Sequence, residues 1–388
     1  MSSLLSSELR KFVAPEFVFG IGARKQVGQY AHNLGAKRIL VVSDAGVKKA
    51  GWTDETVDIL SQEGFECTQY LDVTPNPKAE EVMNGVNLYN EAQCDAIVVV
   101  GGGSPIDCAK GISIVAGNGG KILSYEGVDT VPFPGAPLLC IPTTAGTAAD
   151  VSQFAIITDS SRRNKIAIIT KSIVPDVSLI DPQTTLTMDP FLTACTGLDA
   201  LTHAVEALVS NAHSPITDLH AIKAIELIAK NIEKVIQTPD DLMVRQNMTL
   251  GCLEAGLAFS NASLGAVHAM AHSLGGYLDL PHGECNAILL DHVMAFNFKD
   301  AEKQFDHIAK AMDLEVKGFT TQQLRTSITG EVDRLRRSVG VVRSLGELGV
   351  HRTDVGELAG KAIQDPCLLT NPRPAIKRDI EVIYEEAL

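Results

Sequence analysis

The sequence predicts an α/β domain over residues 1–190 followed by an all-α domain over residues 191–388. In the first part, short β-branched runs alternate with segments of helical apolar spacing, a pattern that builds a parallel sheet covered by helices on both faces. In the second part the strand pattern disappears, and apolar residues recur every three or four positions. A chain of 388 residues is also long enough for two domains of ordinary size.

The elements of the first part follow in order along the chain. Strands are predicted over 38–43, 67–71, 94–100 and 137–141, and helices over 55–63, 79–91 and about 104–115. The run at 94–100 (CDAIVVV) predicts a buried strand because it is β-branched and continuously apolar at its end. Residues 155–157 and 165–170 flank a polar segment and predict a β-hairpin.

The second part contains four strongly periodic segments. Helices are predicted over 191–209, 215–236, 240–259 and 264–277, and the boundary between the two domains is placed near Pro190. A cleft between two such domains is a common place for a ligand.

Composition and charge exclude several classes of function. Hydrophobic residues make up 45% of the chain and charged residues 21%, which argues against long disorder. The 33 Lys and Arg against 47 Asp and Glu give a formal charge of -14, so we expect neither nucleic acid nor membranes as partners. Residues 1–12 lack the apolar core of a signal peptide, and the eight cysteines are scattered singly. We therefore expect a cytoplasmic protein with reduced thiols.

A glycine-rich turn follows the strand at 94–100 and begins a helix. Gly102, Gly103 and Ser104 let the backbone approach an anion closely, and the helix N-terminus offers free N–H groups. Pro105 suits the first helical position. Asp107 either stabilises the N-terminus of this helix through its charge or contacts a ligand. The turn therefore predicts a candidate phosphate site.

Two further features lie at the predicted ends of strands. Thr143, Thr144 and Thr147 offer hydroxyls that bond either a phosphate or ribose, or that cap a turn. Asp44 can accept hydrogen bonds from the adenosine ribose of NAD and repel the 2′-phosphate of NADP. Ligands of α/β sheets collect outside the carboxyl ends of strands, so these residues can share one ligand. The glycines follow Asp44 instead of preceding it, which is not the ordinary Rossmann order.

Acidic and histidine side chains recur at helical spacing in the second part. Asp199 lies four residues before His203, and His268 four residues before His272, so each pair projects from one face of a helix. His282 lies in a Pro–Gly loop. A surface Asp–His contact would explain the pair Asp199 and His203. His268 and His272, however, lie in an apolar helix, where burying an imidazole costs free energy unless it is hydrogen-bonded or binds a metal. We expect a shared metal site; spacing leaves open which four groups bind, and helix geometry alone favours His268 with His272.

Four long motifs, in this order, resemble the iron-containing (group III) alcohol dehydrogenases over essentially the whole chain. They are GGGSPIDCAKGI (101–112), PTTAGTAADVS (142–152), GLDALTHAVEA (197–207) and NASLGAVHAMAHSLGGYLDLPHGECN (261–286). The resemblance implies an α/β dinucleotide-binding domain and an all-α metal-binding and catalytic domain, the dehydroquinate synthase-like architecture, with the active site in the cleft between them.

The resemblance also implies roles for individual residues. The implied metal ligands are Asp199, His203, His268 and His282, with His272 as a catalytic residue that faces the nicotinamide and the substrate. The implied cofactor contacts are Asp44, Asn76, Gly102, Gly103, Ser104, Thr143, Thr144, Thr147, Ser152 and Lys165. Phe259 is implied as an aromatic wall of the substrate pocket. Asp150 and Ser152 stand where the family often has Glu and Thr, and both differences keep the hydrogen-bonding chemistry.

The implied activity is the metal-dependent interconversion of a small primary alcohol or diol and its aldehyde by hydride transfer with NAD(H). A divalent cation favours loss of the hydroxyl proton, just as zinc lowers the pKa of bound water from about 15.7 to about 7. The resemblance implies Fe²⁺, with Zn²⁺ or another divalent metal as alternatives. It also implies a homodimer or an assembly of dimers.

Two other functions remain open at this point. A glycerol dehydrogenase or dehydroquinate synthase type of enzyme also combines NAD with a metal beside a helical domain. A polyanionic substrate would call for Lys and Arg near the ligands, but segments 197–207 and 261–286 contain neither, which favours a small, weakly charged substrate. A non-catalytic nucleotide sensor would bind NAD without turnover.

Overall fold

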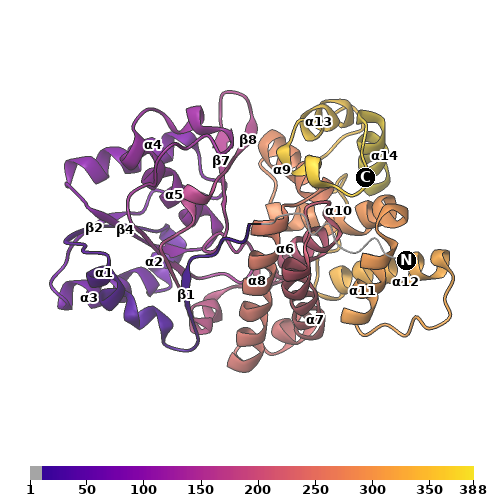
Figure 1. The fold of residues 1–388 in the computed structure, drawn as a ribbon, viewed down its shortest axis with the longest axis horizontal. Coiled ribbons are helices and arrows are strands. Elements are labelled where there is room, and N and C mark those ends of the chain that lie inside the picture. The colour runs from indigo at the N-terminus through magenta and orange to yellow at the C-terminus, as the bar shows by residue number, and fades with distance from the viewer. Residues whose placement is uncertain (1–10) are drawn as a thin grey trace, which may run out of the picture.

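The structure, a computed structural model, describes residues 11–388, so most of the segment considered for a signal peptide lies outside the described residues. An α/β part lies beside a helical part, and the two meet along one side (Figure 1). The predicted fold class is confirmed. None of the described helices is by itself long and apolar enough to cross a membrane. The helices α8 (Leu242–Ala262) and α9 (Ala266–Leu278) meet that test only together, as a pair bent by 99°.

A six-stranded parallel sheet forms the centre of the α/β part, in the order β1-β9-β6-β4-β2-β3. The strands are β1 (Glu16–Phe19), β2 (Arg38–Val42), β3 (Glu66–Tyr70), β4 (Ala96–Gly101), β6 (Leu138–Pro142) and β9 (Val177–Ile180). Every residue of β4 is buried, because helices cover both faces of the sheet and the strand lies in its middle. β2, β4 and β6 are neighbours, so their carboxyl ends meet at one edge.

Helices cover both faces of this sheet, and the side chains of β2 show how. Ile39 and Val41 pack in one apolar cluster with residues of α1 and α3, while Leu40 and Val42 pack in another with residues of α4 and α5. This alternation follows from the two-residue period of a strand. The helices are α1 (Val27–Asn33), α2 (Ala45–Lys49), α3 (Trp52–Gln62), α4 (Ala79–Glu91) and α5 (Gly103–Asn118).

The predicted hairpin is confirmed. β7 (Phe154–Asp159) pairs antiparallel with β8 (Asn164–Ile169), and β5 (Gly127–Val128) adds a third, parallel strand beside β8. This small sheet lies on the side of the α/β part that faces the helical part (Figure 1).

The helical part begins with α6, and no strand follows β9 in the described residues. Its helices are α6 (Pro190–Val209), α7 (Pro215–Gln237), α8 (Leu242–Ala262), α9 (Ala266–Leu278), α10 (His282–Asn297), α11 (Glu302–Ala311), α12 (Thr321–Ser338), α13 (Val355–Ala362) and α14 (Lys377–Ala387). Asp189 caps α6, accepting a hydrogen bond from Leu192 N at 2.9 Å, and Pro190 occupies the first position. The residues of α6 from Thr193 onward are buried, so this helix is the core of the part.

The two parts touch where α9 approaches β8. A Cβ atom added at Gly276 would lie 2.8 Å from both Lys165 N and Asn164 Cα. Backbone atoms on a paired strand have no room to yield, so a glycine is required for the helix to come this close. The contact fixes the position of β8, and with it Lys165, relative to the helices.

Gly276→Ala should therefore destabilise the protein, because the new methyl group forces α9 away from β8. Overpacking of this kind costs typically about 1–3 kcal/mol, so the midpoint of thermal unfolding should fall. Gly330→Ala is the matched control, since Gly330 lies within α12 and an added Cβ there would meet no atom within 4 Å. We expect that variant to gain about 0.5–1 kcal/mol and unfold at a higher temperature. Equal shifts in both variants would contradict the close packing of α9 on β8.

Candidate active site

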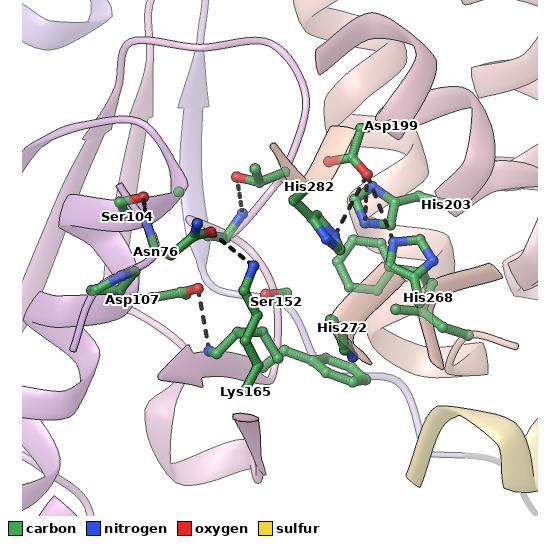
Figure 2. A pocket seen from close by; sticks show the side chains of 18 residues that line it. Asn76, Ser104, Asp107, Ser152, Lys165, Asp199, His203, His268, His272 and His282 are labelled. Carbon is green, nitrogen blue, oxygen red and sulfur yellow. Dashed lines mark hydrogen bonds and ion pairs between the residues drawn. The ribbon is translucent and has the colours of Figure 1, made fainter. Parts of the chain in front are cut away.

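A pocket lies between the two parts, and its wall is drawn from both (Figure 2). The predicted site residues that line it are Asn76, Gly103, Ser104, Thr147, Ser152, Lys165, Asp199, His203, Phe259, His268, His272 and His282. Asp44, Gly102, Thr143 and Thr144 are not among its lining residues; they follow β2, β4 and β6. The wall is completed by Pro77, Asp107, Ala149, Phe154, Ile156 and Leu264.

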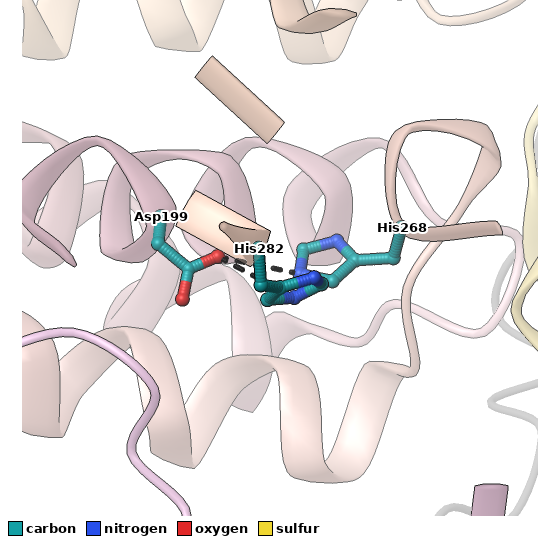
Figure 3. A group of neighbouring side chains, drawn as sticks. All are labelled: Asp199, His268 and His282. Carbon is teal, nitrogen blue, oxygen red and sulfur yellow. Dashed lines mark ion pairs between the residues drawn. The ribbon is translucent and has the colours of Figure 1, made fainter. Parts of the chain in front are cut away.

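Three helices bring one carboxylate and three imidazoles together on one side of this pocket. Asp199 and His203 project from α6, His268 from α9, and His282 is the first residue of α10. Asp199 Oδ1 lies 3.7 Å from His268 Nε2 and 3.9 Å from both His203 Nε2 and His282 Nε2. Figure 3 shows the rings of His268 and His282 turned toward this oxygen. These separations are too long for hydrogen bonds.

The donor set fits a divalent metal. Imidazole nitrogens and a carboxylate oxygen are ligands that Fe²⁺ and Zn²⁺ both accept. Asp199, His203 and His268 are buried, and buried groups of this kind are costly without a partner or a cation. The ligand atoms of Asp199, His268 and His282 all lie within 4.8 Å of one another, which suits a single ion.

The electrostatics of the cluster are those of a cation site. Burial alone would raise the pKa of Asp199, but the surrounding histidines, His203 first among them, hold it well below its ordinary value. Burial lowers the pKa of His203 to about 4 and that of His282 well below its ordinary value. Burial would lower the pKa of His268 too, but the adjacent carboxylates of Asp199 and Glu206 raise it to about 9. A metal ion has to displace the proton that His268 holds at neutral pH.

His272 belongs to a different group from the four residues just described. Its Nδ1 lies 2.8 Å from Asp365 Oδ2, and Cys367 completes the group. The ring of His272 stacks on that of His282 with centroids 5.3 Å apart. The simple pairing of His268 with His272 on helical spacing is thus not the arrangement seen, although both residues line the pocket.

Three polar residues next to these side chains, Glu206, Asn286 and Asp365, were not predicted from the sequence, and the first two are buried. Glu206 Oε2 lies 2.6 Å from His268 Nδ1, and Asn286 Nδ2 donates to Asp199 Oδ1 at 2.6 Å. Glu206 is three residues after His203 on α6, so a stripe of polar residues at helical spacing was available as a signal. Asp365 is 93 residues from His272, and no pattern in the sequence connects them.

On the opposite side of the pocket, two loops meet at the carboxyl ends of β4 and β6. A Cβ added at Gly102 would lie 3.0 Å from Thr144 Cγ2, and one at Gly103 would lie 2.8 Å from Thr147 Cγ2. No side chain among the described residues caps the N-terminus of α5, which leaves its first N–H groups free. This cradle fits the phosphates of a dinucleotide.

Asp44 and Lys165 lie at different places around this cradle. Asp44 follows β2 and caps α2, accepting a hydrogen bond from Val47 N at 2.9 Å. Lys165 is buried, and burial lowers its pKa. Its Nζ donates to Asn76 Oδ1 at 2.7 Å, and Asn76 Nδ2 in turn donates at 2.6 Å to Oδ1 of Asp279, the residue after α9. Asn76 N also donates to Ser104 Oγ at 3.3 Å.

Asp107 faces the pocket and does not stabilise the start of α5. It is the fifth residue of the helix, past the first turn, and its Oδ2 accepts a hydrogen bond from Ile156 N at 3.2 Å. The alternative in which it contacts a ligand is therefore favoured. Burial raises its pKa to about 6, although Lys110 and Lys165 lie nearby.

Aromatic rings pack against one side of the histidine cluster. Phe259 stacks on His203 with centroids 4.2 Å apart, and Phe154 contacts Phe259 with centroids 5.6 Å apart. Ser152 lies next to these rings and accepts hydrogen bonds from the buried Lys110 Nζ, at 2.8 Å through its carbonyl and at 3.3 Å through its hydroxyl.

Known proteins share both halves of this arrangement. The family model described as iron-containing alcohol dehydrogenase matches residues 14–182, and that of the C-terminal region of the Fe-containing alcohol dehydrogenase family matches residues 193–388. The chain is 39% identical to a 1,3-propanediol dehydrogenase of Klebsiella pneumoniae over 371 residues, 95% of this chain and 96% of that protein. It is 37% identical to an NAD-dependent methanol dehydrogenase of Bacillus methanolicus over 97% of this chain and 99% of that one. A crystal structure of a 1,3-propanediol oxidoreductase matches with a TM-score of 0.95 at 38% identity, covering 98% of this chain and 100% of that chain.

The raised pKa of Asp107 predicts a pH-dependent loss of stability. Its ordinary value is 3.8 and its folded value about 6, so the folded protein holds this proton more tightly and stability falls as pH rises between the two. At about 1.4 kcal/mol for each pH unit, the ionised carboxylate costs on the order of 3 kcal/mol above this range. Asp107→Asn should therefore raise the urea midpoint relative to the original protein at pH 8 and lose that advantage at pH 4.

Asp58→Asn provides the control, because Asp58 is exposed on α3. We expect its urea midpoint to follow that of the original protein at both pH values. An advantage of Asp107→Asn that is equal at pH 4 and pH 8 would show that the carboxyl group does not titrate in the stated range.

Proposed function

The chain belongs to the iron-containing alcohol dehydrogenase family, and from that premise we propose that it interconverts a small primary alcohol or diol and its aldehyde by hydride transfer with NAD(H). The observation that carries the proposal is the position of the Asp199 cluster, which shares one pocket with the glycine turn before α5. A hydride donor and a polarising cation would thereby meet in a single space.

We assign the divalent cation, Fe²⁺ with Zn²⁺ as an alternative, to Asp199, His203, His268 and His282. When bound, such a cation lowers the pKa of an alcohol hydroxyl and polarises an aldehyde carbonyl. The chain's own part is to hold the ligands in place. Asn286 fixes the orientation of the Asp199 carboxylate by donating to Oδ1, and Phe259 covers the ring of His203 and keeps water from it.

His272 is the residue we assign to proton transfer. With its Nδ1–H donating to Asp365, the second ring nitrogen, Nε2, is left with a lone pair that can accept the proton of the alcohol hydroxyl. In the direction of aldehyde reduction the same atom returns a proton to the product oxygen. Asp365 is mostly buried and its pKa is depressed by the adjacent His272 despite burial, so it stays ionised and keeps the ring oriented.

The cofactor is assigned to the opposite side of the pocket. The free N–H groups at the start of α5, with Gly102, Gly103 and Ser104, hold the pyrophosphate, and Thr143, Thr144 and Thr147 add hydroxyls beside it. Asp44 accepts from the adenosine ribose, which favours NAD over NADP. Asn76, Ser152 and Lys165 line the same pocket as the histidines, and we assign them to the nicotinamide end of the cofactor.

The alternatives are less well supported. Lys165 is the only Lys or Arg among the described residues that line the pocket, so a polyanionic substrate of the dehydroquinate synthase type would lack partners. A sensor without activity would not need a buried cation site beside the nucleotide. Diols are uncharged as well, so they stay within the proposal.

We also infer a cytoplasmic homodimer or an assembly of dimers that binds neither nucleic acid nor membranes. The formal charge of -14 disfavours anionic polymers and surfaces. All eight cysteines are free thiols in the structure, which fits a reducing compartment. The oligomeric state rests on the family resemblance.

A substrate panel tests the proposed activity. Anaerobically iron-loaded protein is given short primary alcohols, 1,2- and 1,3-propanediol and their aldehydes, with NADH or NADPH and their oxidised forms, and the absorbance of the reduced nicotinamide is followed. We expect steady turnover with NAD(H) and little with NADP(H). NAD binding without turnover of any compound would favour the sensor, and a preference for NADPH would contradict the role of Asp44.

His272→Ala tests the assignment of proton transfer. Removing a general acid–base group typically costs about 10²–10⁴-fold in kcat, while the metal content, measured by elemental analysis, should stay that of the original protein. His292→Ala is the control, because His292 lies in α10 outside the pocket and should keep full activity. Loss of the metal together with activity would instead make His272 a ligand.

A further inference from the structure

The three histidines that face Asp199 differ at their other ring nitrogen. His268 Nδ1 lies 2.6 Å from Glu206 Oε2. Within residues 11–388, no carboxylate lies within ion-pair distance of Nδ1 of His203 or His282, and both of these atoms are buried. One imidazole of the cluster is therefore fixed by a negative charge, and two are not.

Both carboxylate oxygens of Glu206 have a partner, which holds the side chain in place. Its side chain is only 2% exposed, and Oε1 accepts a hydrogen bond from Val267 N at 2.7 Å. Val267 lies in the first turn of α9, where a backbone N–H has no partner within the helix. A Cβ added at Gly265 would lie 2.9 Å from Oε1, so the glycine leaves the space that the carboxylate occupies. One side chain of α6 thus holds both the start of α9 and the ring that α9 carries.

Formal charge points the same way. Three neutral imidazoles and Asp199 around a divalent cation leave one positive charge in a buried site. Glu206 lies directly behind His268 and brings the total to zero, which lowers the cost of burying the ion. A carboxylate behind a ligating histidine also makes the ring a stronger donor.

We propose that Glu206 is a positioning residue for the metal: it holds the proton of His268 on Nδ1, turns Nε2 toward Asp199 Oδ1, and compensates the charge of the ion. This inference rests on the proposed function, because it takes His268 and Asp199 as metal ligands. It predicts that Glu206 acts on metal affinity and on the coordination of the ion.

The test is a metal titration of the full chain with Glu206→Gln. Metal-free protein is titrated anaerobically with Co²⁺ in competition with a chromophoric chelator, and the visible absorption of the bound Co²⁺ is recorded. We expect about 10–100-fold weaker binding and an altered cobalt spectrum. The thermal unfolding midpoint of the metal-free protein is measured alongside, since a purely structural role would lower this midpoint and leave affinity and spectrum unchanged.

Asp181→Asn is the matched control. Asp181 is also a buried carboxylate that accepts a backbone N–H, from Gly22 at 2.9 Å, and it pairs with Arg24 in the α/β part. We expect its loss to lower stability without changing cobalt affinity. Glu206→Asp is the second variant, in case Glu206→Gln does not fold, because it keeps the charge but shortens the side chain that spans Val267 N and His268 Nδ1.

The outcomes separate this inference from the function on which it rests. If the original protein binds no Co²⁺, the proposed metal site and function fail. If it binds Co²⁺ and Glu206→Gln binds with the same affinity and spectrum, the role of Glu206 is overturned and the function stands. If Glu206→Gln does not fold, unchanged affinity in Glu206→Asp overturns the role, and weaker binding in a variant of normal unfolding midpoint supports it.

Discussion

A single oxygen atom, Asp199 Oδ1, is faced by imidazole nitrogens from α6, α9 and α10, where the helical part lines the pocket. Polar groups this deeply buried are costly unless each is satisfied, so the surrounding helices have little freedom in how they pack. Residues without side chains accommodate this packing: Gly265 makes room for the carboxylate behind His268, and a Cβ at Gly283, next to His282, would lie 2.6 Å from Cys195 O. The geometry of the cluster and the packing of the three helices therefore depend on each other, and neither can change alone.

Much of the architecture was predictable because its signals are local. β4 and α6 are long, continuously buried elements whose apolar runs lie within one stretch of sequence. The strands β1 and β9 were not predicted, and the physical reason differs between them. β1 is a four-residue edge strand with an exposed Phe17, so it lacks the apolar alternation of a half-buried strand, whereas β9 is buried but only four residues long. Its existence depends on pairing with β1 and β6, which sequence patterns do not report.

In the candidate site, too, residues with a local sequence signal were predicted and those that depend on distant contacts were not. Asp199 with His203 shows helical spacing, and the glycine turn follows a recognisable strand, so both were accessible from the sequence. Asp365 reaches His272 only through the docking of a distant 3₁₀ turn, and nothing in its neighbourhood marks it. Asp107 shows a third case: its place in the sequence was clear, but its direction was decided by where α5 begins, at Gly103.

The hydrogen bonds of Asn76 affect how the cofactor binds and leaves. Asn76 accepts from Lys165 and donates to Asp279, so it bridges the α/β part and the loop after α9. A dinucleotide that contacts Asn76 or Lys165 must replace these hydrogen bonds with its own, so only the difference in free energy between the two sets contributes to its binding. The loss of these bonds offsets part of the binding free energy of the nucleotide, and a smaller net affinity favours release of the spent cofactor.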